Sequence, residues 1–178
     1  MEAGILMMIQ ERLRHPAWDP WMIWITSLNN GGMIAILTCA LMLAFRRTRR
    51  VGAVAVASLA AEAAVVNLLV KPLAARIRPY EVIEGLSLLV SAQSDYSFPS
   101  GHTAAGFAVA VVMLRLMPAR YGVPALVMAT LIALSRLYVG VHYPTDVLAG
   151  ALIGGGIALI ACRAGRAWVE RDAERLRG

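Results

Sequence analysis

Five apolar runs separated by short polar segments dominate this chain. They cover roughly residues 21–45, 51–70, 103–117, 123–139 and 147–162. A membrane-spanning helix needs about 20 predominantly apolar residues, and these runs approach or reach that length. The composition agrees, because hydrophobic residues make up 59% of the chain, whereas soluble domains contain about 45–50%. We therefore expect an all-α fold, an integral membrane helical bundle.

The N-terminal part is the least regular region of the predicted bundle. The polar stretch 27–32 interrupts the first run, so we expect its first part to be interfacial and the crossing to start near Gly31. Residues 5–13 change from apolar to charged, which is typical of an amphipathic helix on the membrane surface. The prediction is five transmembrane helices, with a sixth, partial crossing left open, plus this interfacial helix. Residues 1–178 contain no repeat and are expected to form one membrane-embedded domain.

The arginines predict the orientation of the bundle. They form the sequence RRTRR at 46–50, flank the turn between the third and fourth runs, and follow the last run. Those after the last run are Arg163, Arg166, Arg171, Arg175 and Arg177. The positive-inside rule places this end, including the C-terminus, in the cytoplasm. With five crossings the N-terminus is outside, although Arg12 and Arg14 count against that.

Charge and cysteine content exclude other classes of protein. The net charge is +6, but the basic residues lie at the ends of apolar runs, so we expect no nucleic-acid partner. Cys39 and Cys162 fall inside apolar runs and are predicted to be free and buried. The N-terminus carries an acidic residue where a signal peptide has a basic region, so no cleaved signal peptide is expected.

Three polar segments are predicted to meet on the outer side of the membrane. Their chemically notable residues are Lys71 and Arg78, then Ser100, Gly101 and His102, then Arg136, His142 and Asp146. Singly, each cation suits an interfacial side chain, Ser100 an N-cap, and Asp146 the dipole of a first helical turn. These separate interpretations do not explain why three cations gather on the side that the positive-inside rule depletes of basic residues.

Phosphoryl transfer is the chemistry that needs this set. Its transition state spreads negative charge over three oxygens, which fixed cations and N–H donors must meet. Lys71, Arg78 and Arg136 would supply the positive charge. Ser100 and Gly101 would open a helix whose free N–H groups and dipole favour an anion.

The two histidines are predicted to have different roles. Pro144 suits the first turn of a helix, which places Asp146 close to His142. A carboxylate on one imidazole nitrogen leaves the other free to attack phosphorus, so His142 is the predicted nucleophile. His102 lacks an obvious carboxylate partner and is predicted to be the general acid. We expect no metal and no cofactor, because the sequence has no Asp-rich cluster or metal-binding His/Glu spacing.

The three segments together resemble the three-part signature of the type 2 phosphatidic acid phosphatase superfamily, complete and in order from Lys71 to Asp146. Members include bacterial lipid phosphatases, undecaprenyl pyrophosphate phosphatases and soluble vanadium haloperoxidases. The resemblance implies the same phosphate-binding residues, protonation of the leaving group by His102, and a phosphohistidine on His142, oriented by Asp146. It also implies a small bacterial member of the family in the cytoplasmic membrane.

The predicted function is therefore a metal-independent lipid phosphatase with its active site facing the extracytoplasmic side. Undecaprenyl pyrophosphate, phosphatidylglycerol phosphate and phosphatidic acid all qualify as substrates, and we favour undecaprenyl pyrophosphate or a broad specificity. Two alternatives stay open. One is a lipid phosphotransferase that uses the same phosphohistidine, and the other is a non-catalytic phospholipid transporter or binding protein. The sequence predicts no oligomeric state.

Three further features accompany these motifs. Glu62 and Asn67 lie within the second run, and we expect them to face the bundle and to be hydrogen-bonded. The segment 79–98 is expected to cover the site, to touch the lipid chain or to be a plain connector. Gly150 and Gly154 have the four-residue spacing that suits close helix packing.

Overall fold

A computed structural model describes residues 1–175, so Arg177 lies outside the described residues. This part of the chain is helical and contains no strand, which confirms the all-α prediction. In chain order the elements are α1 (Glu2–Arg12), α2 (Asp19–Ser27), the 3-10 turn η1 (Asn30–Gly32), α3 (Met33–Ala44), α4 (Arg49–Ala64), the π-helical segment η2 (Val65–Val70), α5 (Lys71–Ala74), α6 (Pro79–Val82), α7 (Gly101–Leu116), α8 (Ala119–Tyr138) and α9 (Pro144–Arg175).

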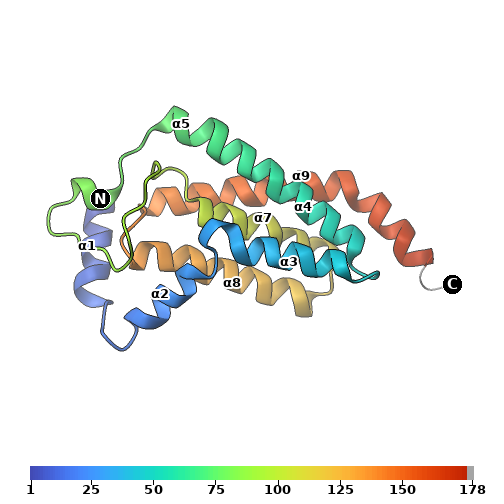
Figure 1. The fold of residues 1–178 in the computed structure, drawn as a ribbon, viewed down its shortest axis with the longest axis horizontal. Coiled ribbons are helices and arrows are strands. Elements are labelled where there is room, and N and C mark those ends of the chain that lie inside the picture. The colour runs from blue at the N-terminus through green and yellow to red at the C-terminus, as the bar shows by residue number, and fades with distance from the viewer. Residues whose placement is uncertain (176–178) are drawn as a thin grey trace.

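The long helices form a bundle with α7 at its centre (Figure 1). Helix α7 packs against α3, α4, α8 and α9. Its buried residues are mostly small, including Ala104, Gly106 and Ala108. Small side chains let neighbouring backbones approach closely, which is how helices associate in membranes. A central position also explains how a helix of only 16 residues belongs to the bundle, since its neighbours cover it.

The number of membrane crossings is only partly settled by helix length. Within residues 1–175, three helical segments are long and apolar enough to cross a membrane, and α2 with α3 makes a fourth if this pair, bent by 44°, counts as one span. Helix α7 is apolar but shorter. The expected number of five crossings, or six, therefore stays a prediction.

The first apolar run is broken where the polar stretch predicted it. Gly31 and Gly32 lie between α2 and α3 with φ angles of 59° and 75°. Glycine adopts this left-handed region without the steric cost that a side chain adds. The two glycines therefore let the chain change direction between α2 and α3.

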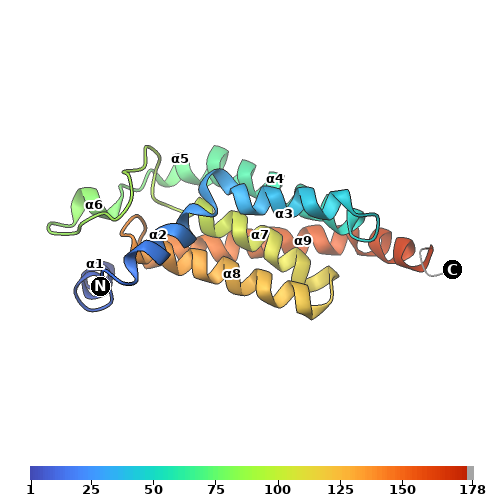
Figure 2. The ribbon, with the colours of Figure 1, turned by 60° about the horizontal axis from the view of Figure 1, so that its bottom comes forward.

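Helix α1 lies across one end of the bundle, as Figures 1 and 2 show from two directions. Its Leu6 is buried, whereas Ile5 and Met8 are exposed. The guanidinium group of Arg14, just beyond α1, donates hydrogen bonds to the carbonyls of Tyr138 and Ser87. A helix was predicted in this region, and the structure confirms it. Its location at a membrane surface stays a prediction.

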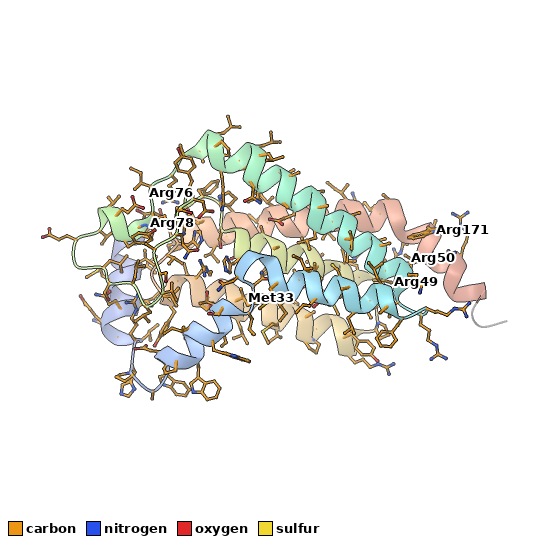
Figure 3. All side chains as sticks on the ribbon, in the orientation of Figure 1. Met33, Arg49, Arg50, Arg76, Arg78 and Arg171 are labelled. Atoms are coloured by element: carbon orange, nitrogen blue, oxygen red, sulfur yellow. The ribbon has the colours of Figure 1, made fainter. Side chains whose placement is uncertain are left out.

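The two ends of the bundle carry different arginines. Figure 3 shows Arg49, Arg50 and Arg171 at the end opposite to Arg76 and Arg78. Between the ends, large apolar side chains on the outer faces of the helices are exposed. Examples are Leu41, Leu68, Leu152 and Ile160. Exposed apolar residues over several helices suit a hydrocarbon environment.

Both cysteines are free and buried, as predicted. Cys39 and Cys162 belong to one apolar cluster that also includes Met42, Val51 and Val112. Neither lies near the end of the bundle where the predicted site residues gather.

Candidate active site

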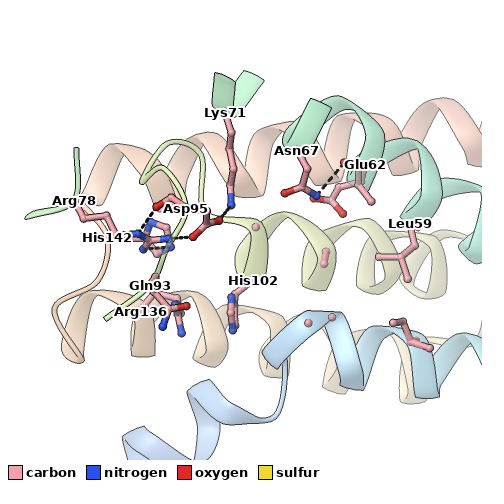
Figure 4. Close-up of a pocket in the computed structure, with 16 residues that line it drawn as sticks. Leu59, Glu62, Asn67, Lys71, Arg78, Gln93, Asp95, His102, Arg136 and His142 are labelled. Carbon is pink, nitrogen blue, oxygen red and sulfur yellow. Dashed lines mark hydrogen bonds and ion pairs between the residues drawn. The ribbon is translucent and has the colours of Figure 1, made fainter. Parts of the chain in front are cut away.

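The predicted site residues meet at the end of the bundle where α5, α7, α8 and α9 converge (Figure 4). A cavity of about 390 Å³ opens there. Six of the eight predicted residues line it, namely Lys71, Arg78, Gly101, His102, Arg136 and His142. The other two, Ser100 and Asp146, are fully buried. The structure thus brings together all three polar segments.

The start of α7 forms one wall of the cavity. Ser100 is the N-cap of this helix, as predicted, and its side chain accepts a hydrogen bond from the backbone nitrogen of Thr103 at 3.5 Å. A Cβ atom at Gly101 would lie 3.7 Å from the Nζ atom of Lys71. The absence of this atom therefore leaves space between the helix terminus and the lysine, where free N–H groups favour an anion.

His142 lies between α8 and α9 and is oriented by Asp146 in the first turn of α9. Its Nδ1 atom lies 3.4 Å from Oδ2 of Asp146. The same oxygen accepts hydrogen bonds from the Ser97 hydroxyl at 2.5 Å and from the Tyr143 backbone at 2.9 Å. Arg76 donates to the other carboxylate oxygen at 2.6 Å. Three donors therefore hold the carboxylate in place beside the imidazole.

The second imidazole nitrogen of His142 faces the cations. Its Nε2 atom lies 3.4 Å from Nη1 of Arg78. Burial lowers the pKa of His142; the hydrogen bond to Asp146 opposes this, and the charges of Arg136 and Arg78 add to the lowering, to about 4. The imidazole is consequently neutral at pH 7, which is the state in which a nitrogen lone pair is available.

Lys71 and Arg78 are occupied by a carboxylate from the loop between α6 and α7. Asp95 pairs with Lys71 through Oδ2 and with Arg78 through Oδ1, the latter at 2.6 Å (Figure 4). Burial alone would raise the pKa of Asp95, but the hydrogen bonds and charges of Lys71 and Arg78 lower it to about 2. The Asp95 side chain is still 50% exposed, so an incoming anion can displace it.

Arg136 has hydrogen-bonding groups without a partner. Only 2% of this residue is exposed, and its Nη1 atom donates to the Thr26 hydroxyl at 2.7 Å. Its Nε and Nη2 atoms are fully enclosed and have no hydrogen-bond partner within the described residues. Burying unpaired donors of a cation is costly, so this guanidinium group is suited to receive an anion in the cavity.

His102 has an amide partner rather than a carboxylate. Its Nε2 atom lies 3.0 Å from Oδ1 of Asn30 in η1. The neighbouring Asn29 donates from its side chain to the backbone carbonyl of His102 at 2.8 Å. The polar break between α2 and α3 therefore braces the start of α7.

The π-helical segment η2 determines the side of the helix from which the Lys71 side chain projects. Ser58, Glu62 and Val66 are buried at four-residue spacing along α4 and η2. That spacing would next bury Val70, but Lys71 is buried instead, with 8% exposed. A π turn adds one residue to a helix, often at a functional site. Here it brings the only lysine of the chain onto the face that lines the cavity.

Four residues at the site were not predicted. They are Asn30, Arg76, Asp95 and Ser97. Arg76 and Ser97 lie within or beside the recognised segments, but no spacing rule separates them from their neighbours. Asn30 and Asp95 reach the site through loops, and nothing local in the sequence points to them.

The segment 79–98 has two parts with different positions. Leu86 is buried, and the backbone nitrogen of Leu89 donates to the carbonyl of Val139 at 3.3 Å, so the apolar part packs against the end of α8. Gln93 and Asp95 in the second part line the cavity. Of the three predicted roles, the structure favours a cover over the site.

Comparisons with known proteins agree with this geometry. The sequence profile of the PAP2 superfamily matches residues 51–170. An undecaprenyl-diphosphatase from Sulfolobus acidocaldarius is 38% identical over 122 residues, which cover 68% of this chain and 59% of that protein. A lipid A 4'-phosphatase from Bacteroides thetaiotaomicron is 35% identical over 50% of this chain and 42% of its own length. The chain thus spans about half the length of these curated relatives.

A solved structure extends the likeness to nearly the whole fold. The crystal structure of Aquifex aeolicus LpxE superposes with a TM-score of 0.81 at 28% sequence identity. The match covers 91% of this chain and 94% of that one. Because the family profile covers more than half of the chain and includes every predicted site residue from Lys71 to Asp146, the chain belongs to the PAP2 superfamily.

Proposed function

We propose that this protein is a membrane lipid phosphatase that removes a phosphate from a lipid phosphate or diphosphate head group through a phosphohistidine. The observation that carries the proposal is that Arg136 and His142 line the same cavity. Arg136 presents two unpartnered buried donors, and the same cavity contains a histidine whose Nδ1 is held by a carboxylate. The first arrangement binds an anion, and the second supplies a nucleophile.

The first step would form a phosphohistidine. The phosphate displaces Asp95 from Lys71 and Arg78, and Arg136 binds a further oxygen. The Nε2 lone pair of His142 attacks phosphorus, while the bond between phosphorus and the lipid oxygen breaks. His102, protonated once the anionic substrate is bound, donates this proton to that oxygen and becomes neutral. Asp146 stabilises the positive charge that develops on the His142 ring.

The second step would release inorganic phosphate. Neutral His102 accepts a proton from a water molecule, whose oxygen attacks phosphorus. The bond between phosphorus and Nε2 breaks, and its electron pair returns to His142. The cations stabilise the charge on the oxygens in both steps. Each residue returns to its starting protonation state.

The side of the membrane on which the reaction would take place is inferred from the arginines at the two ends of the bundle. The site lies opposite to Arg49, Arg50 and Arg171, and the positive-inside rule assigns that arginine-rich end to the cytoplasm. The substrate would then be presented from the outer leaflet of a cytoplasmic membrane. The curated relatives are named for an undecaprenyl diphosphate and for lipid A, so a phosphorylated lipid is the proposed substrate class.

Phosphate release from a panel of lipids tests the proposal. Purified protein in detergent micelles should release phosphate in the presence of EDTA and be inhibited by vanadate. His142→Ala should reduce turnover by about 10³-fold or more, as loss of a nucleophile does in other enzymes. His15→Ala is the matched control, because His15 is exposed and does not line the cavity.

Three outcomes would replace the proposal. Wild-type turnover by His142→Ala would refute the phosphohistidine mechanism. Transfer of phosphate to an added acceptor lipid, detected by product analysis, would identify a phosphotransferase. Lipid binding without hydrolysis across the panel would favour a transporter or binding protein.

A further inference from the structure

The cavity continues beyond the proposed phosphate site along α4 and opens at the surface between α3 and α4. This part is lined by Gly31, Gly32, Ile36, Leu59, Glu62, Ala63, Asn67 and Ala105, of which Gly31, Ile36, Ala63 and Asn67 are exposed. Figure 4 shows Glu62 and Asn67 along the helix that leads away from Lys71 and His142. The whole cavity measures about 390 Å³, which is within the range of about 300–1,000 Å³ for pockets that hold entire small-molecule ligands. It therefore has room for more of a substrate than its phosphate.

Glu62 is a buried acid without a hydrogen-bond partner. It is 3% exposed, and no hydrogen bond or ion pair to its carboxyl group occurs within the described chain. Its neighbour one turn away, Ser58, donates to the carbonyl of Ala108 at 2.9 Å. The expected hydrogen bond of Glu62 is thus absent, although the residue does face the bundle. A polar group buried in this way is costly unless a ligand or water satisfies it.

The direction of the cavity places Glu62 on the path of the lipid. Under the proposed function, on which this step rests, phosphorus lies beside Nε2 of His142 and the lipid tail must reach the hydrocarbon. Glu62 precedes Lys71 by nine residues on the same continuous helix, which is roughly 13 Å of helix rise toward the middle of the bundle. The part of the substrate between its phosphate and its tail therefore passes Glu62.

We infer that Glu62 accepts hydrogen bonds from hydroxyl groups of the substrate, and that the substrate is a lipid whose phosphate is carried by a sugar or another polyol. The carboxyl group of Glu62 offers acceptor oxygens, and hydroxyl groups supply the matching donors. A diphosphate lipid would instead bring a second anion, which has no such donor, to this position.

The surroundings of Glu62 suit a polyol. Asn67 is exposed at the edge of the cavity, so the expectation that it faces the bundle is wrong. Its amide donates to the carbonyl of Ala63 at 3.0 Å, which leaves its side-chain oxygen as a second acceptor. The opposite wall contributes Gly31, Gly32 and Ile36. With acceptor oxygens on one side and two glycines and an apolar side chain on the other, this part of the cavity suits a hydroxylated ring that leads to a lipid tail.

Two lipids with the same tail test the inference. Decaprenyl-phosphoryl ribose 5-phosphate carries a ribose between its terminal phosphate and the rest of the lipid, whereas decaprenyl diphosphate carries no hydroxyl group there. Wild-type protein should hydrolyse the ribose lipid with the higher kcat/KM. Glu62→Ala should lower that kcat/KM by about 10- to 100-fold, because it leaves a buried hydroxyl donor of the substrate without a partner. Its kcat/KM for the diphosphate should stay constant or rise.

Two further variants separate recognition from stability. Glu62→Gln keeps an acceptor oxygen at nearly the same size, so its loss on the ribose lipid should be smaller than that of Glu62→Ala. Ser58→Ala is the matched control, because Ser58 is buried on the same face of α4 but does not line the cavity. It should leave the ratio of kcat/KM values for the two lipids unchanged.

The results separate this inference from the proposed function. The role of Glu62 would be overturned if both Glu62 variants lost the same factor of kcat/KM on the two lipids. It would also be overturned if wild-type protein preferred the diphosphate. Either result would leave the phosphatase activity itself established. If wild-type protein hydrolyses neither lipid nor p-nitrophenyl phosphate, the proposed function fails. Binding of the intact ribose lipid then tests the role of Glu62: weaker binding by Glu62→Ala than by wild-type protein and by Ser58→Ala supports the inference, and equal binding refutes it.

Discussion

His142 combines burial with a cationic neighbourhood, and both favour its neutral form. The pKa of about 4 lies below the ordinary histidine value of about 6.5. Since an imidazolium would be repelled by Arg78, Arg78→Gln should raise the pKa toward the ordinary value. NMR titration of ¹⁵N-histidine-labelled protein measures this, with the signal assigned by its loss in His142→Asn. A pKa near 6.5 for His142 in wild-type protein would contradict the proposed neutral state. An unchanged pKa of His142 in Arg78→Gln would show that Arg78 does not lower it.

Asp95 occupies the two cations that the proposed mechanism assigns to phosphate. Asp95→Asn removes the negative charge while preserving the size of the side chain. Inorganic phosphate and vanadate should then inhibit more strongly, with inhibition constants lowered by about 3- to 10-fold, because the Asp95 side chain is half exposed and solvent screens its ion pairs.

The control for Asp95 is another acid of the same loop. Glu84 is exposed and does not line the cavity, so Glu84→Gln should leave both inhibition constants unchanged. Weaker inhibition of Asp95→Asn would mean that Asp95 helps to position Lys71 and Arg78 for the anion rather than competing with it.

At the scale of elements, the contact between α7 and α9 is closer than side chains would allow. A Cβ atom at Gly154 would lie 2.1 Å from the carbonyl oxygen of Ala104, and one at Gly150 2.6 Å from that of Ser100. The predicted close packing of the two glycines is thus confirmed. It also fixes the start of α7 against the start of α9, and so the distance between the two walls of the site.

Gly154→Ala should therefore destabilise the bundle. The added atom forces α7 and α9 apart, and such overpacking costs about 1–3 kcal/mol. Gly156→Ala is the matched control on the same helix, because a Cβ atom there meets nothing within 4 Å. Thermal unfolding in detergent micelles measures both variants. Equal melting temperatures for Gly154→Ala and Gly156→Ala would show that the contact relaxes without cost.

Element boundaries were predictable where a local signal exists. The polar break before Gly31, the N-cap at Ser100 and the helix start at Pro144 all lie where the sequence placed them. The π-helical segment was not predictable, because VVNLLV reads as part of an uninterrupted apolar run. The extra residue of the π turn leaves no mark in the apolar pattern of the sequence. It nevertheless decides which residue at the junction of η2 and α5 faces the cavity.

At the scale of the whole molecule, the charge asymmetry predicts the topology. In a background with Cys39→Ala and Cys162→Ala, single cysteines are introduced by Ser94→Cys near the site and Arg47→Cys at the opposite end. A membrane-impermeant maleimide applied to intact cells should label Ser94→Cys alone. Arg47→Cys should react only after the membrane is opened. Labelling in the reverse order would place the site in the cytoplasm.

The sequence by itself determined the helices and the chemical character of the site. Apolar runs, caps and the three polar segments are local patterns, and helix formation and phosphate chemistry depend directly on them. Only the tertiary structure decided how these side chains are used. That Asp95 holds Lys71 and Arg78, and that Glu62 has no partner, depends on residues from separate segments. Which groups pair, and which are left for a ligand, is settled when the helices pack.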